Sequence, residues 1–138
     1  MIKVSIDYTG QLRCRSVHCP SNQALETDAP VDNNGLGQTF SPTDLVASAL
    51  GSCMATIMGI VARKKGYDLV DMHIDVEKHM SEDAPRRIVK LAVSVEMPLP
   101  ENHPDRKVLE SCALSCPVYH SLEADIDVPV SWTWQPIS

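Results

Sequence analysis

Apolar and polar residues alternate along both ends of the chain, on either side of one long uncharged stretch. Residues 2–8 and 11–19 alternate as two strands joined by a turn at Thr9–Gly10. Residues 23–28 are expected to add a third short strand. Residues 29–40 contain Pro, Asn-Asn-Gly and Gly, which predict an ordered loop before the uncharged stretch begins.

The segment Ser41–Gly66 predicts one long helix. Ser41 suits the N-cap position, and Asp44 lies three residues later, where its carboxylate completes a capping box. Basic residues 63–65 lie where the helix dipole favours cations, and the closing glycine suits the position just after a helix. Apolar residues lie nearly all round this helix, so we expect it to be largely buried.

A membrane span is the alternative for the same segment. Residues 45–62 carry no charge and precede a basic cluster. The length only just reaches that of a span, however, and the segment contains Ser48, Gly51, Ser52 and Thr56. Amphipathic strands flank it. A core helix is therefore favoured over a membrane span.

The second half of the chain predicts a hairpin, two short helices and a last strand. Residues 70–77 and 89–97 alternate as two strands with a turn at 81–85, and Pro98 and Pro100 are expected to end the second strand. Asn102 or His103 is expected to cap a helix that ends near Cys116. Pro117 then begins a short helix that runs to about residue 124, and residues 126–134 alternate as a strand. This order predicts an α+β fold with antiparallel sheet, in a single domain of residues 1–138.

Composition narrows the functional classes. The net charge of −6 opposes binding to nucleic acid or to an anionic membrane, and we expect neither partner. The N-terminus alternates as a strand and has no apolar core of a signal peptide. Five cysteines are an odd number for a disulfide-bonded secreted domain. A cytoplasmic protein with free thiols is the simpler interpretation.

Cys53 lies in the middle of the long helix, too far from its N-terminus for the helix dipole to activate the thiol. A thiol in apolar surroundings is normally inert, so a core cysteine is one interpretation. A nucleophile is the other, and it needs a cation from elsewhere in the fold. The loop of residues 29–40 has no Lys or Arg. The nearest upstream guanidinium groups belong to Arg13 and Arg15, on one face of the second strand.

Cys116 precedes Pro117 at a helix junction, where free N–H groups favour a thiolate, and this Cys-Pro pair indicates redox chemistry. Cys112 lies one turn earlier. A zinc site is the alternative, because Cys112, Cys116 and His120 have helical spacing and the chain has further cysteines. The proline interrupts that spacing, and no spacing matches a structural zinc motif.

The segments LETDAPVDNNGLGQTFSPTDLVASALGSCMATIMGI and SCPVYHSL resemble the OsmC/Ohr family of thiol peroxidases, in particular its OsmC-like subgroup. The motifs are Ser-Pro-x-Asp-Leu, Ala-Leu-Gly-x-Cys and the later Cys-Pro-Val, and the order of elements matches over the whole chain. The resemblance implies an OsmC-like fold in which antiparallel sheets wrap around a long central helix. It also implies an intertwined homodimer with active sites at the subunit interface and with its central helices packed back to back.

The resemblance further implies a cofactor-free peroxidase of oxidative or osmotic stress that reduces organic hydroperoxides. Cys53 takes the position of the peroxidatic cysteine and Cys116 that of the resolving one, with a small thiol or dithiol as reductant. In the family a glutamate holds the arginine that stabilises the thiolate. This chain has Thr43 at the glutamate position and Asp44 next to it. We therefore assign Asp44 and Arg15 to the site, with Arg13 as the alternative arginine.

Because that glutamate is missing, a second hypothesis is an OsmC-fold protein that binds a small molecule and has little or no peroxidase activity. Cys112 is either a competing resolving thiol or a residue that fills the helix face.

Overall fold

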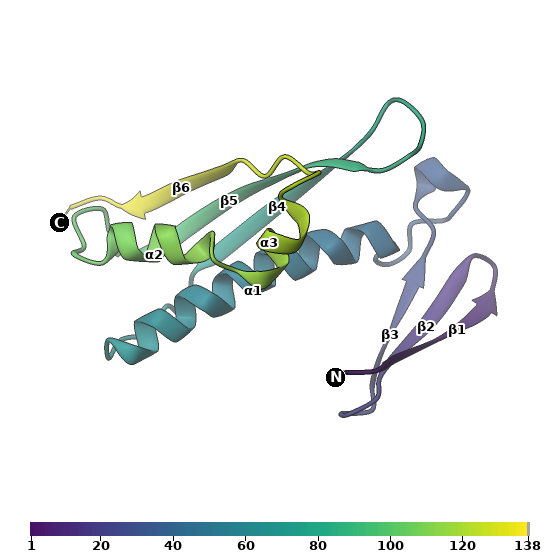
Figure 1. The fold of residues 1–138 in the computed structure, drawn as a ribbon, viewed down its shortest axis with the longest axis horizontal. Helices are drawn as coiled ribbons and strands as arrows, with labels where there is room; N and C mark the ends of the chain where they lie inside the picture. The colour runs from purple at the N-terminus through teal and green to yellow at the C-terminus, as the bar shows by residue number, and fades with distance from the viewer. Residues whose placement is uncertain (138) are drawn as a thin grey trace. The chain divides into compact units, whose positions relative to one another are not determined.

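The computed structural model describes residues 1–137 and divides into two compact units, with the boundary between Val46 and Ala47. The first unit contains a three-stranded antiparallel sheet in the order β1-β2-β3 (Figure 1). Its elements are β1 (Val4–Gly10), β2 (Arg13–His18), β3 (Gln23–Asp28) and the short 3-10 helix η1 (Val31–Asn33). All three predicted strands are confirmed.

The first turn lies two residues later than predicted. Thr9 and Gly10 belong to β1, and the chain reverses at Gln11 and Leu12, whose φ values are 55° and 63°. The backbone N–H of Leu12 donates a hydrogen bond to the Tyr8 hydroxyl at 3.2 Å. Glycine marked the turn in the sequence, but non-glycine residues adopt the left-handed conformation here.

Strand pairing separates the two faces of this sheet. Val4, Ile6 and Tyr8 of β1 share a face with Leu25 of β3, and all four side chains are exposed. The opposite face carries charged residues, namely Asp7, Arg13, Arg15, Glu26 and Asp28. The only buried residues of this unit are Thr27, Asp28 and Ser41, all of them polar.

Helix α1 (Pro42–Lys64) begins where the sequence predicts. The backbone N–H of Ser41 donates to the Asp44 carboxylate at 2.9 Å, and the backbone N–H of Asp44 donates to the Ser41 hydroxyl at 3.1 Å. These two bonds are the predicted capping box. Gly66 has a φ of 89°, as expected of the glycine after a helix.

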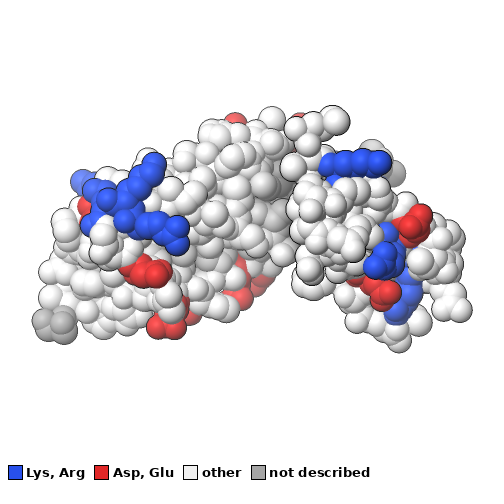
Figure 2. Space-filling view, turned by 90° about the horizontal axis from the view of Figure 1, so that it is seen from below, with Lys and Arg blue, Asp and Glu red and all other residues white. Residues whose placement is uncertain are grey.

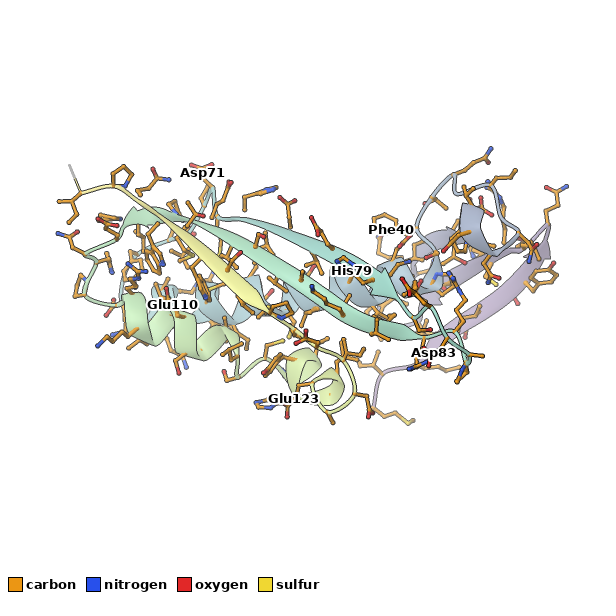
Figure 3. The ribbon with its side chains drawn as sticks, turned by 90° about the horizontal axis from the view of Figure 1, so that it is seen from above. Phe40, Asp71, His79, Asp83, Glu110 and Glu123 are labelled. Carbon is orange, nitrogen blue, oxygen red and sulfur yellow. The ribbon has the colours of Figure 1, made fainter. Side chains whose placement is uncertain are left out.

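The second unit contains the sheet β4-β5-β6, made of β4 (His73–Met80), β5 (Ile88–Pro100) and β6 (Val130–Gln135). The predicted hairpin of β4 and β5 is antiparallel, with Asp83 at its tip (Figure 3). The prediction that the sheet is wholly antiparallel is wrong in one detail, because β6 pairs with β5 in parallel. The chain between them forms a helical crossover, which returns β6 in the same direction as β5.

That crossover contains α2 (Arg106–Ala113) and α3 (Pro117–Leu122). Helix α2 starts later than predicted: its N-cap is Asp105, not Asn102 or His103. Glu110 links α2 to β6, because its carboxylate accepts a hydrogen bond from the Trp134 indole at 2.8 Å (Figure 3). Within α2 the same carboxylate also accepts from Arg106 Nε at 3.2 Å. Strand β5 also runs through Pro98 to Pro100, beyond its predicted end.

The core of the second unit lies where α1, α2 and α3 pack on one face of the sheet (Figure 1). Gly51 makes close contact with β4 possible, because a Cβ at this position would lie 3.1 Å from Val76 Cγ2 and 3.4 Å from Ile74 Cγ2. The side chains with no more than 1% exposure are Leu50, Met54, Met58, Ala62, Leu91, Val93, Val95, Met97, Leu109, Ala113 and Cys116.

The expectation that α1 is largely buried is wrong for the single chain. A stripe made of Ala49, Ser52, Thr56 and Ile60 is exposed. Basic side chains gather at the C-terminal end of the helix, and the surface beside them carries few charges (Figure 2). By length and composition α1 meets the criteria for a membrane span, but its other side packs beneath the sheet as a core helix does. The single domain stays a prediction.

Candidate active site

The second unit brings two of the predicted site residues together. Cys53 lies half-buried in the middle of α1, and Cys116 lies fully buried between α2 and α3. The two side chains are close enough for Cys53 to raise the pKa of Cys116. Two thiols that are far apart in the sequence are therefore neighbours in the fold.

Cys116 is the N-cap of α3, as the sequence predicts. Pro117 occupies the first turn, and the Cys116 sulfur accepts a hydrogen bond from the backbone N–H of Tyr119 at 3.3 Å. Burial raises the pKa of the Cys116 thiol, and the neighbouring Cys53 raises it further. The Cys116 thiol therefore tends to keep its proton.

Cys112 has a different environment. Its thiol donates to the carbonyl oxygen of Leu109 at 3.2 Å, and burial raises the pKa of this thiol. His120 is exposed and lies against the ring of Tyr119. Over residues 1–137, no group of three or more His, Cys, Asp or Glu side chains is arranged to hold a metal ion.

The first unit carries both candidate arginines. An open groove of about 650 Å³ lies on it, and Arg13 and Arg15 both line this groove. Arg15 is exposed and makes no hydrogen bond or ion pair within the described chain. The other side chains that line the groove include Leu25, Glu26, Gln38 and Phe40.

Arg13 is held in place by a carboxylate that the sequence analysis did not single out. Asp28 is 1% exposed, and its Oδ2 lies 3.4 Å from Arg13 Nη2. The same oxygen accepts from the backbone N–H of Gln38 at 3.1 Å, and the side-chain oxygen of Gln38 also accepts from Arg13. Asp28 and Arg13 are directly opposite each other on β3 and β2. A paired-strand alignment of the N-terminal sequence would have shown this juxtaposition.

Asp44 and Thr43 lie at the start of α1. The Asp44 carboxylate is engaged in the capping box with Ser41, and the Thr43 hydroxyl lies 3.1 Å from the Ser41 hydroxyl. Within the first unit, the carboxylate that pairs with Arg13 is that of Asp28.

Comparison with known proteins agrees with this architecture. The sequence matches the family of OsmC-like proteins over residues 35–131. The structure is similar to that of a Psychrobacter arcticus 273-4 protein assigned to the osmotic stress induced and detoxification response, with 39% identity, 96% of each chain covered and a TM-score of 0.89. No match was found among curated protein sequences.

Two more distant structures share the fold. An organic hydroperoxide resistance protein OsmC of Legionella pneumophila is 17% identical, with 96% of each chain covered and a TM-score of 0.77. The organic hydroperoxide resistance protein OhrB of Bacillus subtilis is 18% identical, with 96% of this chain and 98% of that chain covered and a TM-score of 0.69. The family match and the 39% identical structure together show that this chain belongs to the OsmC-like protein family.

Proposed function

We propose that this protein is a cytoplasmic, two-cysteine peroxidase that reduces organic hydroperoxides. The observation that carries the proposal is the proximity of Cys53 to the buried Cys116 at the start of α3, in an OsmC-like chain. Hydroperoxide resistance proteins are among the structures that share its fold. The uncharged stretch around Cys53 favours an organic hydroperoxide over hydrogen peroxide.

The chemistry proceeds in three steps. The Cys53 thiolate attacks the O–O bond, its sulfur gains a hydroxyl group, and the alkoxide that leaves takes a proton to become an alcohol. Cys116 attacks the resulting sulfenic acid, a disulfide forms, and water leaves. A small thiol or dithiol then reduces the disulfide by exchange and is itself oxidised.

The proposed site also uses an arginine from the N-terminal sheet to stabilise the thiolate. Among residues 1–137 no carboxylate pairs with Arg15, so its guanidinium is available, whereas Arg13 is restrained by Asp28 and Gln38. Arg15→Met and Arg13→Met separate the two possibilities. The arginine that serves Cys53 is the one whose loss slows the first turnover with hydroperoxide. Asp44 is the acid proposed for this site, so Asp44→Asn, which loses the charge, should also slow that first turnover.

We also propose that the protein is a homodimer. Its first unit exposes the apolar face of Val4, Ile6, Tyr8 and Leu25, and α1 exposes the stripe of small and apolar residues that ends at Ile60. Such surfaces are normally covered by a partner. Light scattering after size exclusion should give twice the chain mass. Ile6→Glu should reduce it to one chain mass, whereas Glu26→Gln on the opposite face should not.

The peroxidase proposal is tested by one equivalent of an organic hydroperoxide such as cumene hydroperoxide. Peptide mass spectrometry should find a Cys53–Cys116 disulfide. Analysis of the small-molecule products should find one molecule of alcohol per chain. Cys112→Ser is the matched control and should behave as the wild type. A wild-type protein that forms no such disulfide refutes the two-cysteine mechanism.

The alternative is an OsmC-fold binding protein with weak peroxidase activity. It is favoured by Thr43 at the family's glutamate position, together with the engagement of Asp44 in the helix cap. If this alternative holds, the wild type turns over slowly and Thr43→Glu raises the rate strongly. An ordinary wild-type rate excludes it.

A further inference from the structure

The groove of the first unit carries two opposite charges that have no partner within residues 1–137. Arg15 and Glu26 both line the groove, and they lie directly opposite each other on β2 and β3. Side chains at such positions are normally close enough to form an ion pair. Here neither side chain makes an ion pair or a hydrogen bond with the described residues, so both charges are open to a ligand.

Arg13 adds hydrogen-bond donors whose position is fixed. Its guanidinium contacts the buried Asp28 carboxylate and the side chain of Gln38, and both contacts are made through Nη2. A guanidinium has five N–H donors, and those on Nε and Nη1 have no partner within the described chain. Because Arg13 and Arg15 are two residues apart on one strand, their side chains lie on the same face. The groove therefore offers two guanidinium groups to one anion.

The charges of the groove select the class of ligand. A simple carboxylate would pair with the arginines but would also lie beside the unpaired carboxylate of Glu26, which repels it. A simple amine would meet the opposite difficulty. A zwitterion with adjacent carboxylate and ammonium groups satisfies both signs of charge, and charge-assisted hydrogen bonds are the stronger ones. Ala24 and the exposed Phe40 add apolar surface to the same groove.

We propose that this groove binds a free α-amino acid with a small apolar side chain. Arg15 and the free donors of Arg13 bind the α-carboxylate. Glu26 accepts from the α-ammonium group, and the apolar side chain of the ligand lies against Phe40. Asp7 on β1 also lies opposite Arg15 but does not line the groove, so it should take no part. The inference goes beyond the proposed peroxidase, because all of these residues belong to the first unit and no cysteine is needed.

Binding is measured by titrating the isotope-labelled full-length protein and following its amide chemical shifts at neutral pH. The probe is L-leucine. It is compared with 4-methylpentanoate, which lacks the ammonium group, and with 3-methylbutylamine, which lacks the carboxylate. We expect L-leucine to bind about three- to tenfold more tightly than either analogue, because each analogue loses one charged partner. Equal affinities for L-leucine and 4-methylpentanoate would overturn the proposal, and so would the absence of any shift in β2 and β3.

Three variants assign the two ends of the ligand. Arg15→Met should weaken the binding of L-leucine by about three- to tenfold and leave 3-methylbutylamine unaffected. Glu26→Gln should weaken L-leucine to a similar extent and should not weaken 4-methylpentanoate. Asp7→Asn is the matched control, because it removes a carboxylate from the other side of Arg15, and it should leave L-leucine binding unchanged. If Asp7→Asn and Glu26→Gln weakened L-leucine equally, the assignment of its ammonium group to the groove would be wrong.

The outcome of the titration does not depend on hydroperoxide turnover. An active peroxidase that does not bind L-leucine overturns the groove proposal alone. A protein that binds L-leucine in the expected order but consumes no hydroperoxide retains the groove proposal and contradicts the peroxidase proposal.

Discussion

Replacing Asp28 should destabilise the protein more than any other single change at the charged face of the N-terminal sheet. The Asp28 carboxylate is 1% exposed and receives hydrogen bonds from Arg13 and from the backbone of Gln38. Its removal leaves the backbone amide of Gln38 without its acceptor, and it leaves the partly buried guanidinium with the Gln38 side chain but no carboxylate. Breaking a buried ion pair by removing one partner costs about 3–5 kcal/mol.

The structure places the expected cost at the lower end of that range. Arg13 is 28% exposed, so water replaces part of the lost interaction. We expect Asp28→Ala to lower the free energy of unfolding by about 3 kcal/mol. Asp28→Asn preserves the shape and an acceptor and loses only the charge, so it should cost about 1.5 kcal/mol.

Urea unfolding followed by far-ultraviolet circular dichroism measures these differences. Glu26→Gln is the matched control: it removes an exposed carboxylate from the neighbouring groove and should change stability by no more than about 0.5 kcal/mol. If Asp28→Ala and Glu26→Gln had equal free energies of unfolding, the ion pair of Asp28 with Arg13 would not stabilise this face of the sheet.

Three further predictions concern the long helix and its C-terminal end. Ser41→Ala removes the capping box and should cost about 1–2 kcal/mol in thermal unfolding, whereas Ser48→Ala on the exposed side should be neutral; equal effects would contradict the capping role. Gly51→Val forces a side chain against Val76 and should cost about 1–3 kcal/mol, which an unchanged melting temperature would rule out. Burial, with a hydrogen bond to a carboxylate, raises the pKa of Tyr67 to about 12 from its usual 10.0. The contribution of Tyr67 to the free energy of unfolding should therefore be fully present below pH 10. It should decline as the pH rises towards 12, because the tyrosine of the unfolded chain loses its proton first. Tyr67→Phe should flatten that decline, and an identical profile in this variant would exclude Tyr67 as its source.

The elements with strong local signals were predictable. Ser41, Asp44 and Gly66 are local capping signals, and the structure confirms each of them. Cys116 at the start of α3 was equally predictable, because Pro117 can begin a helix but cannot continue one. These features depend on residues within one turn of each other.

What could not be predicted depends on contacts between distant residues. The parallel pairing of β6 depends on the crossover through α2 and α3, and alternation alone does not encode strand direction. The pairing of Asp28 with Arg13 required the alignment of β2 with β3. The exposed stripe of α1 was missed because residues such as Ala49 and Ile60 are apolar, and hydrophobicity does not say which partner covers them.

Residues 1–46 contain no buried apolar side chain, and this affects how the stability of the protein depends on its concentration. A sheet without a hydrophobic core of its own is stabilised mainly by its strand hydrogen bonds and by the ion pair of Asp28 with Arg13. Its order must then be supplied by whatever covers Val4, Ile6 and Tyr8. If that cover is a second copy, resistance to heat becomes a matter of mass action, and diluting the protein weakens the N-terminal sheet as heating does.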